Sequence, residues 1–204
     1  MRFAPRVEPE RNAWKNQPGY TVAMLEDTLK LMLAAAARTP AHTLAPQLDE
    51  LFRVLAAPAT ALQAEQAEDD IWALWMEYPV RAARDALEQA TQAISQREFG
   101  EAETRLDRLV EDYPDYAEAW NKRATLRFLQ GRDADSVHDI QRTIALEPRH
   151  FGAICGFAQI CLRRERDDLA LFALQRAQEV HPTMASVKEA ISQLTARRAS
   201  GPLH

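Results

Sequence analysis

The sequence predicts an all-α protein in which helical hairpins stack into an α-solenoid, and three observations support this fold class. Pro114, Pro148 and Pro182 lie 34 residues apart. The segments between these prolines keep a common phase, with small residues and large apolar residues at equivalent positions. The flanking segments 48–55 and 185–198 also carry apolar residues on one helical face. The three repeats are 83–116, 117–150 and 151–184. Position 8 is Ala90, Ala124 and Ala158, position 20 is Ala102, Ser136 and Ala170, and position 24 is Leu106, Ile140 and Leu174.

The physical reason for such a period is that one helical hairpin cannot cover its own apolar stripe. A second hairpin buries that stripe and offers a new one, and about three hairpins are needed before the stack is stable. The prolines end each second helix and set the turn into the next first helix.

The N-terminal region predicts an arm followed by a helix, with an alternative left open. Residues 1–20 contain three prolines and few aliphatic side chains, which is typical of a mobile arm. Val22, Leu25, Leu29, Met32, Leu33 and Ala36 form one face of an amphipathic helix. The alternative is a secretory leader over 24–45, with Met24 as the start and a cleavage site at Thr43-Leu44-Ala45. Glu26 and Asp27 stand where a leader needs basic residues. We expect a cytoplasmic protein, or a periplasmic one if the leader is real.

Residues 46–79 predict two further helices, the first ending at Pro58 and the second at Pro79. In phase with the repeats, Phe52 takes position 4 and Trp72 and Trp75 take positions 24 and 27. We therefore expect residues 21–82 to include a degenerate repeat, with the two tryptophans as a core pair.

Residues 185–204 predict the other end of the array. Val187, Ile191 and Leu194 share one helical face, and charged residues occupy the rest, as expected of a solubilising final helix. Gly201 and Pro202 are expected to stop that helix.

The 34-residue pattern resembles the tetratricopeptide repeat family over residues 83–184. The segments 120–132 (WNKRATLRFLQGR) and 147–153 (EPRHFGA) are similar to bacterial and plastid members whose role is poorly defined. Two positions depart from the family pattern: position 11 is Ala93, Arg127 and Cys161, and position 7 is Gln89, Arg123 and Phe157. The resemblance implies a right-handed superhelix whose first helices line a concave groove that binds a protein or peptide.

That resemblance also implies which side chains line the groove, because the family uses positions 2, 5, 6, 9, 12 and 13. Carried over, with two residues of the turn between the second and third repeats, it predicts a peptide-binding set of Asn121, Lys122, Thr125, Phe128, Arg149, His150, Gln159 and Arg163. Amides and cations in this set suit a peptide backbone and acidic groups. The carboxylate clamp of some family members is disfavoured, since its positions hold Leu87, Thr91, Gly152 and Gly156.

Other function classes find little support in the sequence. The net charge of −5 and the pI of about 5.6 argue against nucleic-acid binding, and no apolar run is long enough to span a membrane. No phosphate-binding loop, nucleophile motif or metal-ligand spacing is present, so we expect neither an enzyme nor a cofactor. Cys155 and Cys161 are interpreted as buried apolar residues, with a thiol or metal site as the alternative. A structural subunit that self-associates through residues 21–57 is the alternative function.

Overall fold

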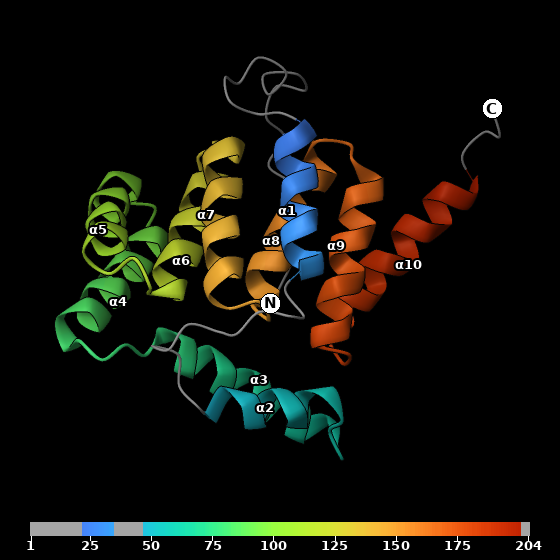
Figure 1. The fold of residues 1–204 in the computed structure, drawn as a ribbon, viewed down its shortest axis with the longest axis horizontal. Helices are drawn as coiled ribbons and strands as arrows, with labels where there is room; N and C mark the ends of the chain where they lie inside the picture. The colour runs from blue at the N-terminus through green and yellow to red at the C-terminus, as the bar shows by residue number, and fades with distance from the viewer. Residues whose placement is uncertain (1–21, 35–46, 201–204) are drawn as a thin grey trace.

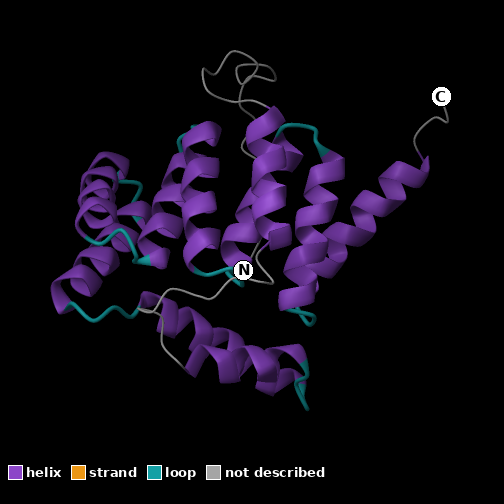
Figure 2. Ribbon diagram, in the orientation of Figure 1, coloured by secondary structure: helices purple, strands orange, loops and turns teal. Residues whose placement is uncertain are grey.

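The computed structural model describes residues 22–34 and 47–200, and over these residues the chain is helical with no strand (Figure 1, Figure 2). The fold class predicted from the sequence, an all-α solenoid, is confirmed. The predicted arm at 1–20, the cleavage site at 43–45 and the stop at Gly201 and Pro202 lie outside the described residues. The helices are α1 (Val22–Ala34), α2 (Gln47–Ala56), α3 (Ala61–Met76), α4 (Arg81–Ser95), α5 (Phe99–Asp112), α6 (Ala117–Leu129), α7 (Asp133–Leu146), α8 (Phe151–Arg163), α9 (Asp167–Val180) and α10 (Ala185–Ser200).

Three hairpins, α4–α5, α6–α7 and α8–α9, stand side by side, and α10 packs on α9 (Figure 1). The close helix crossings use the small residues at positions 8 and 20, which are buried in every repeat. Where position 20 is Ser136 instead of alanine, its hydroxyl donates to the Ala124 carbonyl at 2.8 Å. The buried hydroxyl is thereby satisfied, which explains why serine is tolerated in this crossing.

The turn inside each hairpin adopts one backbone conformation. Arg97, Gly131 and Glu165 share position 15 and have φ of 63°, 76° and 59°. In each turn the next N–H bonds back to the carbonyl of position 11, as in Glu98 to Ala93 at 2.9 Å. This is the left-handed C-terminal cap that glycine favours, so two of the three repeats hold a non-glycine residue in a strained conformation.

Helix α1 packs on the second helices α7 and α9. Leu25, Thr28 and Met32 are buried there, and Gln141 on α7 donates to the Thr28 hydroxyl at 2.8 Å. The predicted apolar face is partly reproduced, but it is rotated toward Thr28, and Leu33 remains 58% exposed.

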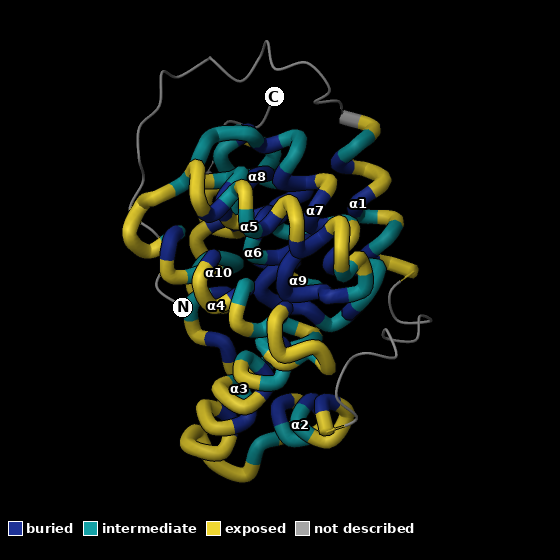
Figure 3. The backbone as a smooth tube through the Cα atoms, turned by 90° about the vertical axis from the view of Figure 1, so that its left-hand side faces the viewer, coloured by how far each residue is buried: buried dark blue, intermediate teal, exposed yellow. Residues whose placement is uncertain are grey.

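The repeat register suggested that the hairpin formed by α2 and α3 continues the stack beside α4. In the structure it does not. It lies across the ends of the other hairpins (Figure 1), and Figure 3 shows its exposed outer side beyond the buried centre of the array. Phe52 and Trp75 pack on Phe151, with ring centroids 6.5 and 4.8 Å away. The outer side of α4 carries exposed Asp85, Glu88, Gln89 and Gln92. A polar surface of this kind cannot bury a tryptophan side chain. The start of α8 can, because it presents the apolar ring of Phe151.

Candidate functional site

We call repeat positions 2, 5, 6, 9, 12 and 13 of α4, α6 and α8 the first-helix face. Six of the predicted site residues hold such positions on α6 and α8, and Arg149 and His150 stand in the turn before α8. The structure divides them into two groups. Asn121, Lys122, Arg149 and His150 lie near the proline turns and are engaged with neighbouring side chains. Thr125, Phe128, Gln159 and Arg163 lie toward the other end of α6 and α8.

The first group surrounds a buried carboxylate. Glu118 and His150 are both 0% exposed, and His150 Nε2 lies 2.8 Å from a Glu118 oxygen. Lys122 Nζ lies 2.9 Å from the other oxygen, and the Asn121 amide donates to both at 3.1 and 3.2 Å. Burial opposes the ionisation of Glu118, but Lys122 and His150 outweigh it and lower its pKa to about 2. This carboxylate is therefore charged and fully partnered at neutral pH.

His150 is also a helix cap. The Ala153 N–H donates to His150 Nδ1 at 3.1 Å, so this nitrogen carries no proton and Nε2–H donates to Glu118. The imidazole stacks on Trp75 at 3.9 Å with an interplanar angle of 10°. His150 holds α8, α6 and α3 together, and a ligand on the surface cannot reach its ring.

Arg149 is engaged in a similar way. Its guanidinium pairs with Glu147 at 3.0 Å and with Asp49 of α2 at 2.7 Å, and it lies over the Phe52 ring at 4.3 Å. It ties the second proline turn to the N-terminal hairpin.

The second group leaves side chains accessible. Thr125 is exposed and Gln159 is half-buried. Arg163 lies over the Phe128 ring at 3.9 Å and also pairs with buried Asp133. Next to them Leu129 is 47% exposed. This group therefore offers both polar and apolar contacts to a second molecule.

Sequence reasoning missed an ion cluster inside the second hairpin. Asp139 is fully buried between Arg123 at 2.9 Å and Arg127 at 2.7 Å, and Arg123 also reaches Asp107 at 2.9 Å. The arginines stand at positions 7 and 11, where the repeat pattern is broken. An acidic residue 16 positions after Arg123 was the signal that could have revealed the pair.

The two cysteines lie in apolar surroundings. Burial raises the pKa of Cys155 and of Cys161 to about 12, so their thiolates are scarce at neutral pH. Among the residues that the structure describes, no group of three metal-ligating side chains gathers, and no helix is long and apolar enough to cross a membrane.

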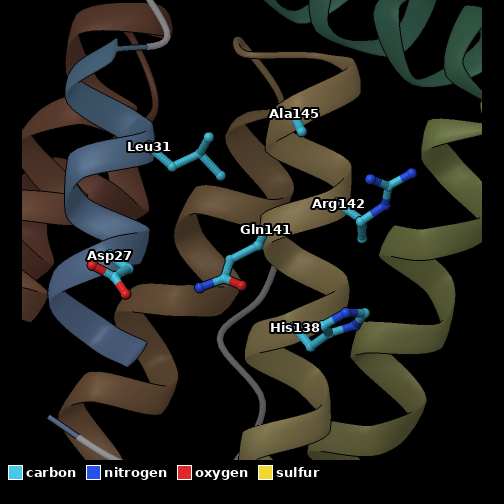
Figure 4. A pocket seen from close by; sticks show the side chains of 6 residues that line it. All are labelled: Asp27, Leu31, His138, Gln141, Arg142 and Ala145. Carbon is cyan, nitrogen blue, oxygen red and sulfur yellow. The ribbon is translucent and has the colours of Figure 1, made fainter. Parts of the chain in front are cut away.

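A shallow depression of about 310 Å³ lies between α1 and α7. Figure 4 shows Asp27 and Leu31 on one side and four residues of α7 on the other, namely His138, Gln141, Arg142 and Ala145. It lies against the second helices and contains none of the predicted site residues.

The sequence and the fold were compared with those of known proteins. No protein-family model matches the sequence. A Rhizobium etli protein named "TPR repeat-containing protein" is 32% identical over 153 residues, which are 75% of each chain. Among solved structures, the first TPR domain of Spaghetti (RPAP3), bound to the HSP90 peptide SRMEEVD, aligns with 58% of this chain and 94% of its own. The TM-score is 0.54 and the sequence identity is 17%.

Proposed function

We propose a function that starts from the family, because this chain belongs to the tetratricopeptide repeat (TPR) family. The protein is a non-catalytic binding module that holds a protein or peptide on its first-helix face. The similar fold of the RPAP3 domain, which carries a bound peptide, supports this class of partner.

One observation carries the proposal: the accessible half of the face repeats its chemistry three times. Position 9 is polar and position 12 is apolar in each first helix, and all six side chains are at least partly accessible. These are Thr91, Thr125 and Gln159, and Ile94, Phe128 and Leu162. Alternating polar and apolar rows suit an extended segment, which needs hydrogen bonds for its backbone and pockets for alternate side chains.

The test blocks this face without touching the buried network. Alanine at both Asn121 and Lys122 would strip Glu118 of two partners, so lost binding could reflect lost structure. Thr125→Arg and Gln159→Arg instead place a long cation on the accessible half. Gln175→Arg, at an exposed position of α9, is the matched control.

The measurement is affinity capture with the full chain from cells that produce it, after circular dichroism has shown each variant folded. We expect the captured proteins to be shared by the wild type and Gln175→Arg and lost from the other two. Equal capture by all four forms would refute binding on this face.

A further inference from the structure

Part of the first-helix face is occupied by the α2–α3 hairpin of the protein itself. A Cβ atom built on Gly152 would lie 2.5 Å from Cη2 and 3.2 Å from Cζ2 of Trp72. Lys122 Nζ lies 5.7 Å from the centroid of the same ring. Gly152 and Lys122 hold repeat positions 2 and 6, which the family pattern assigns to ligands, so the Trp72 indole sits where a partner's side chain would sit.

Helix α3 and the segment directly after it reach all three proline turns in succession. Glu68 accepts from His181 at 3.0 Å, Trp75 stacks on His150, and the Tyr78 hydroxyl donates to Asp115 at 2.5 Å. Glu68 and Trp75 are seven positions apart on α3, which corresponds to a rise of about 10 Å along the helix axis. This rise is close to the spacing of packed helices. Because this rise matches the spacing of packed helices, α3 crosses the proline turns at Pro182 and Pro148, and the segment after α3 reaches the turn at Pro114.

The hairpin has a small core of its own. Helices α2 and α3 pack chiefly on each other and bury Leu48, Leu55, Ala67 and Ile71. Two of their ion pairs to the array, Asp49–Arg149 and Glu77–Arg84, have acidic partners 72% and 62% exposed, and exposed pairs contribute little stability. A third pair, Glu68–His181, has a buried histidine. Phe52 and Trp75 add an aromatic contact to Phe151. Because the hairpin packs more on itself than on the array, we expect it to open at a lower free energy than the whole protein.

We infer that the α2–α3 hairpin is a cover that lifts as a unit, and that it gates a second part of the binding surface, formed by Lys122, Gly152 and Cys155. This inference relies on the proposed function only for the gating step; the lifting of the cover can be tested without any partner.

The hairpin itself indicates what that surface fits. Residues 47–79 contain seven acidic side chains and one basic one, and their contacts on the array include Arg84, Lys122 and Arg149. A partner that takes its place is an acidic helical segment with an aromatic side chain in the position of Trp72.

Cys155 is a native reporter for this movement. It lies one turn after Gly152 on α8, is 5% exposed, and is close enough to Glu68 of α3 to feel its charge. Cys161 is also buried but lies at the far end of α8, away from the hairpin. With iodoacetamide and mass spectrometry of the peptides, we expect Cys155 in the wild type to react at least about tenfold faster than Cys161.

Two glycines of α8 provide a matched pair of variants. Gly152→Ala drives a methyl group into Trp72, whereas Gly156→Ala places one 3.7 Å from Ile140, an ordinary contact. Both changes raise helix propensity equally. Gly152→Ala should speed the labelling of Cys155 a further tenfold or so and leave Cys161 unchanged, and Gly156→Ala should alter neither rate.

If Gly152→Ala does not fold, Trp72→Ala replaces it, since that change removes the indole and adds nothing to α8. Equal labelling rates at both cysteines in the wild type, or equal acceleration of both in the variants, would show that the hairpin opens only when the whole protein unfolds. Either result would overturn the inference that the hairpin is a cover. Trp72→Ala should also increase the amount of captured partner. Unchanged or reduced capture by Trp72→Ala beside selective labelling would overturn the gating step. Absence of any captured partner with the wild type would count against the proposed function alone.

Discussion

His150 illustrates at the scale of single residues how position and role can differ. Repeat register placed it in the binding set, yet its two ring nitrogens are used by Glu118 and by the start of α8. The repeat register predicts where the Cα atom of a residue lies. It does not predict which buried neighbour forms hydrogen bonds with the side chain. The same holds for Asn121 and Lys122, whose partner Glu118 is visible in the sequence only as one acidic residue among 30.

The buried carboxylate makes stability depend on pH. The pKa of Glu118 falls from 4.5 to about 2 on folding, so its contribution is complete above pH 4.5 and is lost as the pH falls toward 2. We predict that the free energy of unfolding, measured by urea titration, decreases over this window. Glu118→Gln should be less stable at pH 7 and show a shallower acid dependence. An unchanged slope would contradict the assigned network.

The ion cluster around Asp139 predicts a contrast between two aspartates. Asp139→Ala leaves Arg123 and Arg127 without their buried partner and should lower stability by about 3 kcal/mol. Asp107→Ala removes a half-exposed partner of the same arginines and should change stability by less than about 1 kcal/mol. Chemical denaturation of both variants measures the two changes in the free energy of unfolding. Equal decreases would argue against a buried cluster.

At the scale of elements, the repeat turns are more uniform than their residues. Position 15 adopts positive φ in all three hairpins although only one residue there is glycine. The conformation is imposed by the helix ends and the bond back to position 11, and Arg97 and Glu165 tolerate it at a cost.

Relief of that strain is measurable. Arg97→Gly and Glu165→Gly should each raise the free energy of unfolding by about 0.5–1 kcal/mol, because the gain at positive φ exceeds the extra freedom of glycine in the unfolded chain. Gly131→Ala should lower it by about 1 kcal/mol. Thermal melts of the three variants provide the comparison, and destabilisation by both glycine substitutions would contradict the cap.

The elements also show where sequence reasoning reached its limit. The small residues and the prolines fix the stacking of α4 to α9, since steric fit at the crossings depends on local residue size. The position of the α2–α3 hairpin on the array depends on which distant surface offers apolar contact to Trp72 and Trp75. The repeat pattern of the sequence does not contain that information. The face of α1 was similarly predicted by hydropathy, which could not foresee that Gln141 would recruit Thr28.

On the scale of the whole molecule, the described apolar faces of α1 and α2 are largely covered by the chain itself. Self-association through residues 21–57, the alternative function, would have to use other surfaces. We therefore predict a monomer of about 23.1 kDa by light scattering of the full chain. A stable dimer would favour the alternative, and a shortened chain of residues 46–204 would then show whether the N-terminal helix forms the contact.

In the function proposed above, the first helices of the repeats bind the partner and the second helices do not. Hydrogen exchange of the full chain with and without a captured, purified partner tests this most directly. We predict added protection in 117–129 and 151–163, the ranges of α6 and α8, with little change in α7 and α9. Protection confined to α7 and α9 would contradict it.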